Sequence, residues 1–181
     1  INKIHESTKD LDEIIQDMSF ILQIKKGLQG TFSKIVVLSV LHKVLHSLRE
    51  EIQAKQITII NKCGESVFIN GIEPYVYSVF YNAISNSIKY THARKQSKIT
   101  IESSDSSEIV KMVFSDNGIG FDSHHNREKL FKPFSRLNSK IEGKGLGLYL
   151  IKIEMESMHG NVDIQSEAGM GKILTLTFNK H

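Results

Sequence analysis

The stretch SDNGIGFD, from Ser115 to Asp122, follows directly on the alternating apolar run of residues 109–114. Alternation of apolar and polar residues predicts a strand with one buried face. An acidic residue, an amide and two spaced glycines therefore stand where this strand ends. Asn-Gly is one of the strongest turn signals. By itself the stretch allows either a simple tight turn or a loop that approaches a ligand, and the surrounding sequence has to decide.

The composition is that of an ordinary globular domain. The chain has 181 residues, 40% hydrophobic and 24% charged, with a formal net charge of +3. This length allows one domain with a sizeable core, or one domain with an appendage. The basic residues are scattered, which argues against nucleic acid as a partner. The single cysteine, Cys63, cannot form an internal disulfide and favours a reducing compartment.

The sequence also bears on location. No apolar run approaches the roughly 20 residues that a membrane span needs, so we expect no membrane contact by this stretch. The sequence begins at Ile1 rather than Met, and we expect it to be a fragment of a longer protein. A cytoplasmic location is predicted, and a membrane anchor of the full-length protein would lie upstream.

The N-terminal segment predicts a long amphipathic helix. Apolar residues recur at helical spacing from Ile4 to Leu22, and a basic and glycine-containing stop follows at residues 25–27. No second apolar element lies beside this helix in the sequence. We therefore expect it to pack against another chain or against upstream sequence. The alternative is that it folds back on the downstream domain.

The rest of the chain predicts grouped strands with helices on one face. This grouping favours a two-layer α/β sandwich over a doubly wound sheet. The expected elements are a helix from Ser33 to about Lys55, a hairpin of strands 57–61 and 67–70, a helix opened by Pro74 and running to about Ala93, strands 99–103 and 109–115, a short helix near 127–131, a helix at 146–158, and strands 162–166 and 173–178.

Two asparagines lie on one face of the helix that Pro74 opens. Asn82 and Asn86 are four residues apart, as are Asn86 and Tyr90, and Lys89 lies on nearly the same face. An amide oxygen is a neutral ligand that suits Mg²⁺, which takes further oxygens from water and phosphates. Taken alone, the pair is better explained as two solvated asparagines, because asparagine is a mediocre helix former that is common on exposed faces.

A second glycine run, EGKGLGLYL from Glu142 to Leu150, stands just before a predicted helix. Glycines let the backbone approach a ligand, and a helix N-terminus offers free N–H groups and a positive dipole end to anions. Lys144 adds a positive charge. The run differs from the Walker A and Rossmann patterns, and alone it could be a plain loop.

In combination these motifs carry more weight, because five of them occur in a fixed order. They resemble the N, G1, F, G2 and G3 boxes of the ATP-binding domain of sensor histidine kinases, which belongs to a wider class shared with gyrase, heat-shock chaperones and mismatch-repair ATPases. The resemblance covers residues 30–181. The matching stretches are NAISNSIKY (82–90), DNGIGFD (116–122), LFKPF (130–134), GKGLGL (143–148) and GMG (169–171).

The resemblance implies a binding site for ATP. Asp116 would accept a hydrogen bond from the adenine amino group, and Gly118 and Gly120 would let the chain turn beneath the base. Tyr90 would lie against the nucleoside. These assignments interpret the acidic residue and the glycines of the opening stretch as parts of a base-binding loop.

On the phosphate side, the resemblance implies that Asn86 coordinates Mg²⁺ and that Lys89 offsets phosphate charge. Asn82 belongs to the same face, and Arg136 matches a position that often contacts the terminal phosphate. A lid would span roughly residues 123–143. His124 and His125 at its start are expected to be solvated, and metal binding is the alternative. Gly145, Gly147 and the amide of Leu146 would cap the phosphates. Lys144 stands where the family commonly has a small or hydroxyl residue, and it would either tighten ATP binding or only shift the dynamics of the lid.

The implied function is that of a protein-histidine kinase, which uses ATP and Mg²⁺ to phosphorylate a histidine for relay to a response-regulator receiver domain. Residues 1–27 resemble the second helix of the dimerisation and phosphoacceptor hairpin, and residues 28–181 the catalytic domain. A homodimer through that hairpin is implied. His5 lacks the expected acceptor context, so the phosphoacceptor is expected upstream of Ile1.

Asn82 separates this chain from hydrolytic relatives. ATPases of this class carry a Glu one turn before the magnesium asparagine, where it can activate water as a general base. An amide cannot accept that proton. The kinase interpretation keeps two alternatives: a nucleotide-binding module that has lost kinase activity and serves as sensor or scaffold, and a hydrolytic, dimer-clamping ATPase.

Overall fold

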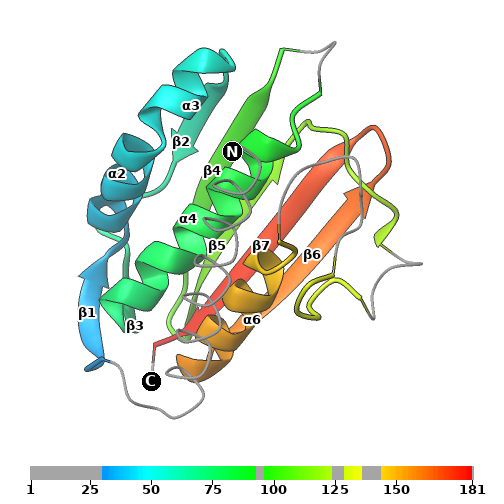
Figure 1. Ribbon diagram of the computed structural model, residues 1–181. Helices are drawn as coiled ribbons and strands as arrows, with labels where there is room; N and C mark the ends of the chain where they lie inside the picture. Colours follow the sequence, from blue (N-terminus) through cyan, green and yellow to red (C-terminus); the bar gives the residue numbers. More distant parts are fainter. Residues whose placement is uncertain (1–29, 93–95, 124–128, 136–143, 181) are drawn as a thin grey trace, which may run out of the picture.

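A layer of helices covers one face of a five-stranded sheet, and a two-stranded ribbon lies beside it (Figure 1). The computed structural model describes residues 30–92, 96–123, 129–135 and 144–180. The expected two-layer α/β sandwich is confirmed. The elements are β1 (Ser33–Val36), α2 (Val37–Ser47), α3 (Arg49–Ala54), β2 (Thr58–Lys62), β3 (Phe68–Gly71), α4 (Glu73–Lys89), β4 (Lys98–Asp105), β5 (Ile109–Asp116), α6 (Gly147–Ser157), β6 (Asn161–Glu167) and β7 (Gly171–Asn179).

The sheet has the strand order β2-β4-β5-β7-β6. β2 runs parallel to β4, and the other neighbours are antiparallel. In the register of β5 and β7, Asp116 stands directly opposite Lys172. The end of β5, where the DNGIGFD motif begins, and the start of β7 therefore lie side by side.

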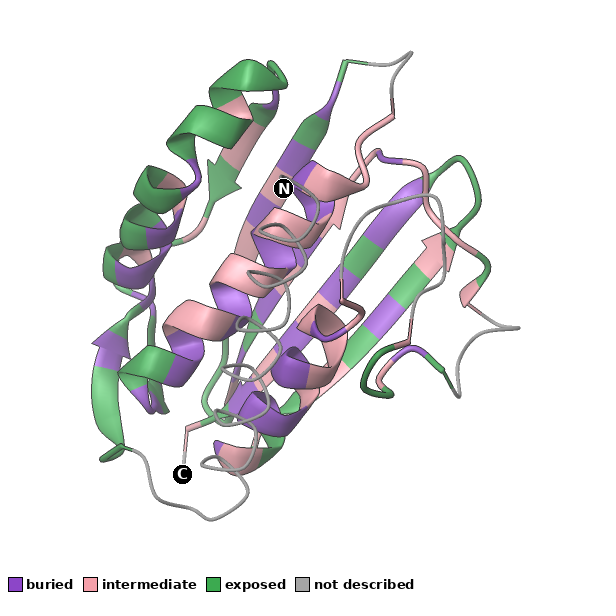
Figure 2. Ribbon diagram, viewed as in Figure 1, coloured by how far each residue is buried: buried purple, intermediate pink, exposed green. Residues whose placement is uncertain are grey.

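The core lies between the inner face of the sheet and the helices. Alternate residues of β7, Leu174, Leu176 and Phe178, are buried, while Ile173 is 46% exposed on the other face. Figure 2 shows the matching buried stripes on α4 and α6, which lie side by side over the sheet. Strand alternation and helical periodicity thus point at the same interior. The rings of Phe80 and Phe114 join the two layers, with their centroids 5.3 Å apart.

One carboxyl group is buried in this core. Glu154 of α6 has no exposed surface, and neither of its carboxyl oxygens has a hydrogen-bond partner within the described residues. Burial raises the pKa of Glu154 from its ordinary 4.5 to about 8, and the nearby Ser78 hydroxyl lowers it by less. Because desolvation disfavours the charged form, Glu154 is mostly protonated at neutral pH.

The predicted helix from Ser33 to Lys55 is wrong at its start. Residues 33–36 form β1, which pairs antiparallel with β3, and the helix begins at Val37. The Val37 N–H donates to the carbonyl of Val67 in the segment before β3, at 3.0 Å. The β-branched Ile35 and Val36 fit a strand, and pairing with β3 decides their conformation.

The predicted hairpin of strands 57–61 and 67–70 is also wrong. β2 pairs with β4, 40 residues further along in register, and β3 pairs with β1. The two strands are neighbours in sequence but belong to different sheets. The crossover through α4, which lies between β2 and β4 in the sequence, sets their partners. Local turn signals do not predict such a crossover.

The other described elements match their predictions. α4 carries Pro74 in its first turn and ends at Lys89, a few residues earlier than expected. The four strands β4 to β7 and α6 lie where the pattern placed them. The N-terminal helix, His5, Arg136 and most of the predicted lid and its short helix lie outside the described residues.

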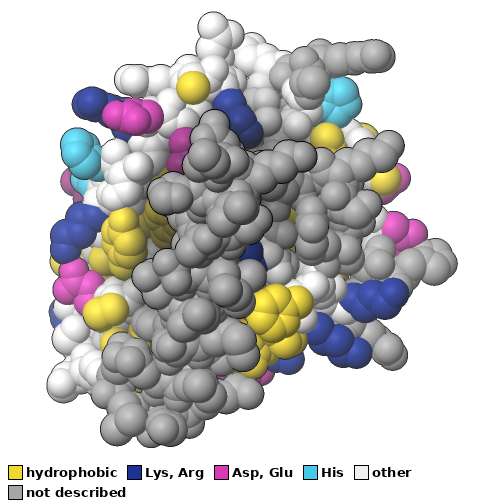
Figure 3. Space-filling view, viewed as in Figure 1, with side chains coloured by type: hydrophobic (Ala, Val, Ile, Leu, Met, Phe, Trp, Pro, Cys, Tyr) yellow, Lys and Arg dark blue, Asp and Glu magenta, His cyan; other side chains and the backbone are white. Residues whose placement is uncertain are grey.

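The described surface gives two further observations. On the face in Figure 3, acidic and basic side chains are interspersed. Among the ion pairs of the described residues, Lys43 Nζ lies 2.6 Å from Glu73 Oε1. Within the described ranges, no helix combines the length and the apolar character that crossing a membrane requires.

Candidate functional site

A cavity of about 380 Å³ lies between α4, the loop after β5 and the start of α6. It brings together residues from four separate motifs. Among the described residues with a predicted nucleotide contact, only Gly118 is not part of its lining. The predicted residues that line the cavity are Asn82, Asn86, Lys89, Tyr90, Asp116, Gly120, Lys144, Gly145, Leu146 and Gly147.

Helix α4 presents its asparagines toward the start of α6. Asn82 Nδ2 donates to the carbonyl of Ser78 at 3.0 Å, which fixes the orientation of the amide. A Cβ added at Gly147 would lie 3.1 Å from Asn82 Oδ1 and 3.0 Å from Asn86 Nδ2. Gly147 therefore lets the first turn of α6 approach both amides closely.

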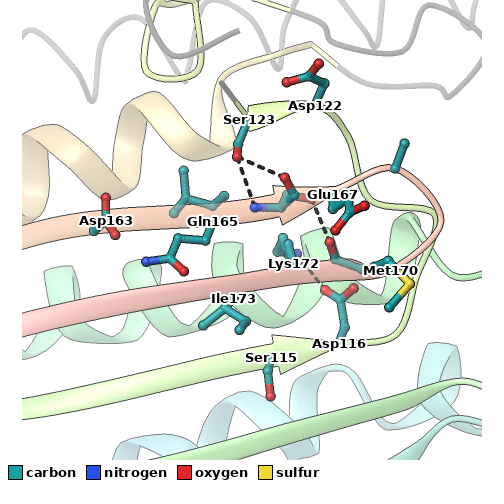
Figure 4. Close-up of a pocket in the computed structure, with 14 residues that line it drawn as sticks. Ser115, Asp116, Asp122, Ser123, Asp163, Gln165, Glu167, Met170, Lys172 and Ile173 are labelled. Carbon is teal, nitrogen blue, oxygen red and sulfur yellow. Dashed lines mark hydrogen bonds and ion pairs between the residues drawn. The ribbon is translucent and has the colours of Figure 1, made fainter. Parts of the chain in front are cut away.

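The Asp116 carboxylate lies at the end of β5 in the floor of the cavity. Its side chain is 5% exposed. Oδ1 accepts a hydrogen bond from the Gly118 N–H at 3.0 Å. Oδ2 lies 3.0 Å from Lys172 Nζ in an ion pair, but within the described residues it accepts no aligned hydrogen bond (Figure 4). Gly118 thus orients a buried carboxylate that keeps one acceptor oxygen for a further donor.

Lys172 is a site residue that the sequence interpretation missed. It is 7% exposed, and its Nζ donates to Ser87 Oγ at 2.9 Å. Burial lowers the pKa of Lys172, and the neighbouring Asp116 carboxylate counteracts this. The signal was present in the sequence, because alternation along β7 places position 172 on the same face as Leu174 and Leu176. A lysine on an apolar face calls for a partner.

Asn117 has a structural role. Its Oδ1 accepts a hydrogen bond from the Lys98 N–H, and its Nδ2 donates to the Gln96 carbonyl, both at 2.8 Å. These bonds fasten the end of β5 to the start of β4. In the SDNGIGFD stretch, the amide of Asn117 therefore anchors the loop, and the Asp116 carboxylate faces the cavity.

The loop after β5 is held at both ends. The Ile119 N–H donates to the Tyr90 carbonyl at the end of α4, at 2.9 Å. Further on, Ser123 Oγ donates to the Ser166 carbonyl at 2.9 Å, and the Ser166 N–H donates back to Ser123 Oγ at 3.2 Å (Figure 4). Spacing alone did not indicate this serine pair, which ties the loop to β6.

A larger hollow of about 990 Å³ adjoins the first one along β6 and β7 (Figure 4). It shares Asp116, Ile164 and Lys172 with the smaller cavity, and Asp163 and Glu167 add acidic groups to its wall. The asparagines of α4 and the glycines before α6 do not line it. We place the candidate site in the smaller cavity because the predicted base and phosphate residues meet there.

Comparisons with known proteins agree with this arrangement. The family model described as "Histidine kinase-, DNA gyrase B-, and HSP90-like ATPase" matches residues 71–181. The heme sensor protein HssS of Staphylococcus saprophyticus is 26% identical over 181 residues, which cover 99% of this chain and 38% of HssS. The chain thus spans well under half the length of this curated relative.

Solved structures share the fold. The histidine kinase AdeS of Acinetobacter baumannii matches with a TM-score of 0.80 and 18% identity, over 99% of this chain and 83% of that one. The histidine kinase ThkA, in complex with the response regulator protein TrrA, matches with a TM-score of 0.74 and 18% identity, over 96% of this chain and 49% of that one. The chain therefore belongs to the family of histidine kinase-, DNA gyrase B- and HSP90-like ATPases.

Proposed function

We propose that this domain binds ATP together with Mg²⁺ in the 380 Å³ cavity and delivers the γ-phosphate to a histidine outside the described residues. One observation carries the proposal. The amide face of α4, the Asp116 carboxylate and the N-terminus of α6 line a single cavity. These are the groups that a base, a divalent ion and a chain of phosphates would each require.

The base end of the cavity fits adenine. Asp116 Oδ2 is a buried acceptor that lies 3.0 Å from Lys172 Nζ, and a carboxylate oxygen can accept a further hydrogen bond. The exocyclic amino group of adenine is a donor, whereas the corresponding position of guanine is a carbonyl oxygen that a carboxylate would repel. A buried acceptor left unmatched is unfavourable, so Asp116 is expected to select for the amino group.

The phosphate end fits a metal-bound triphosphate. The amides of Asn82 and Asn86 stand beside the first turn of α6, where backbone N–H groups and the helix dipole favour anions. Mg²⁺, when bound, would offset phosphate charge. Asn86 is the proposed ligand, with Lys89 and Lys144 as positive groups of the lining. This chain then acts mainly by positioning the phosphates and excluding water.

The identity of Asn82 supports transfer over hydrolysis. An amide cannot act as a general base at neutral pH, so water in the cavity would not be activated. The proposed acceptor histidine lies upstream of Ile1, and Arg136 is proposed to contact the γ-phosphate. We further propose residues 1–27 as a dimerising hairpin helix, residues 28–181 as the catalytic domain, a homodimer, and a response-regulator receiver domain as partner, as in the ThkA–TrrA complex.

Calorimetry tests the binding site. Asp116→Asn and Asn86→Ala are each expected to weaken Mg²⁺–ATP binding by at least tenfold without unfolding the domain, since each removes a hydrogen bond or ligand of roughly 1.5–3 kcal/mol. Asp163→Asn, in the neighbouring hollow, is the matched control and is expected to bind normally. Unchanged affinity in both site variants would refute the site.

Labelling of the full-length protein tests the reaction. With ATP labelled at the γ-phosphate, a histidine kinase gives protein-bound label that is stable to base and labile to acid. Binding without transfer would instead support a sensor or scaffold role. Rapid release of free phosphate would support a hydrolytic ATPase.

A further inference from the structure

We propose that Lys172 is a second base-reading residue, whose amine donates a hydrogen bond to the ring nitrogen N1 of adenine while Asp116 accepts one from the amino group. The inference rests on the proposed function, because it assigns a partner within the same base pocket. It adds a specificity contact from the lysine that follows the GMG motif.

Position and burial carry the inference. Lys172 and Asp116 are direct cross-strand neighbours on the inner face of β7 and β5. Both side chains are more than nine-tenths buried, and both line the candidate cavity. Figure 4 shows the two side chains meeting between the strands. A buried amine and a buried carboxylate therefore stand side by side in the floor where the base would lie.

Hydrogen bonds on the side of α4 hold the Lys172 amine in place. Lys172 Nζ donates to Ser87 Oγ at 2.9 Å, and Ser87 Oγ donates in turn to the Ala83 carbonyl at 3.1 Å. Both partners belong to α4. Nζ also lies 3.0 Å from Asp116 Oδ2 in an ion pair. A lysine ammonium carries three N–H groups, so one remains for the base when the other two face Ser87 and Asp116.

This pair of groups matches one purine and opposes the other. In adenine, a donor (the amino group) and an acceptor (N1) are adjacent on one edge. In guanine the same two positions hold an acceptor (O6) and a donor (N1–H). A guanine in the same pose would place its carbonyl against Asp116 and its N–H against Lys172. Two buried mismatches discriminate more strongly than one.

Base analogues test the contact in the wild-type protein. The probes are ATP, 1-deaza-ATP, which lacks the N1 acceptor, and 7-deaza-ATP, which keeps it. We expect 1-deaza-ATP to bind roughly 10- to 100-fold more weakly than ATP, the range for a hydrogen bond to a charged group, and 7-deaza-ATP to bind like ATP. Equal binding of all three by calorimetry would overturn the inference without any variant.

Variants then assign the effect to the lysine. In Lys172→Met, ATP and 1-deaza-ATP are expected to bind equally, while Lys172→Gln, which keeps an N–H donor, should retain part of the difference. Lys111→Met, on the outer face of β5, is the control and should behave as wild type. If the difference persists in a folded Lys172→Met protein, another group reads N1 and the inference is wrong. If Lys172→Met does not fold, a difference between ATP and 1-deaza-ATP that is undiminished in Lys172→Gln would count against the inference equally.

The outcomes also separate this inference from the proposed function. If Asp116→Asn weakens ATP binding but 1-deaza-ATP binds as tightly as ATP, only the proposed role of Lys172 is wrong. If ATP does not bind, or binds equally well to Asp116→Asn, the proposed adenine site in this cavity is itself wrong.

Discussion

The buried Glu154 makes the stability of this domain depend on pH in an unusual direction. Burial raises the pKa of Glu154 from 4.5 to about 8. A carboxyl group with a raised pKa in the folded state binds its proton more tightly there than in the unfolded chain. Its favourable contribution is complete below pH 4.5 and is lost as the pH rises through 8. Most paired carboxylates give the opposite trend.

The size of the effect follows from the two pKa values. Their difference of about 3.5, at 1.36 kcal/mol for each pKa unit, amounts to roughly 5 kcal/mol in full. Between pH 5 and pH 9 the wild-type free energy of unfolding should fall by about 4 kcal/mol through this group, since its unfolded form is already partly ionised at pH 5. That is a large fraction of the stability of an ordinary domain.

Urea denaturation at pH 5 to 9 measures this decrease. Glu154→Gln resembles the protonated side chain and does not titrate, so subtracting its unfolding free energies from those of wild type cancels the contributions of other groups. Glu156→Gln, an exposed neighbour on α6, is the control and should keep the full pH dependence. Parallel curves for wild type and Glu154→Gln would refute the assignment of a high pKa to this carboxyl group.

Two further predictions concern the amide face of α4. Gly147→Ala should leave stability unchanged or raise it by up to about 1 kcal/mol in thermal unfolding, because alanine suits a helix better than glycine. Its Cβ would crowd Asn86 and is expected to weaken Mg²⁺–ATP binding several-fold, whereas Lys152→Ala on the exposed side of α6 should not; wild-type affinity in Gly147→Ala would contradict the close approach. Asn82→Glu is expected to raise phosphate release from ATP by on the order of 10²-fold, since it restores a general base, and Asn82→Gln should not. A phosphate assay that gives equal rates for the two variants would count against the role given to position 82.

Much of the fold followed from local patterns. The strands around Phe114 and Leu176 and the helix around Asn86 could be predicted because one side of each is buried, and burial imposes a period of two or of 3.6 residues on the sequence. The resemblance in motif order then joined the asparagines, the aspartate and the glycines into one site. The structure brings these residues together around one cavity.

The errors concern partner choice, which no local pattern records. Residues Ser33–Val36 form a strand because they pair with β3. The expected hairpin is wrong because β2 pairs with β4, which follows α4 in the sequence. Lys172 was missed for a related reason. Its meaning depends on Asp116, which is 56 positions earlier in the chain and comes opposite it only through sheet register.

The two glycines of the GMG motif differ in how far they can be replaced. Gly169 and Gly171 both have positive φ, at +79° and +89°. Beside Gly169, no described atom lies within 4 Å of an added Cβ, whereas at Gly171 such an atom would collide with the backbone carbonyl of Asp116. Asparagine or aspartate can therefore replace Gly169, because these residues tolerate the left-handed region. The second position accepts only glycine, because any side chain there would strike the backbone of β5 at Asp116.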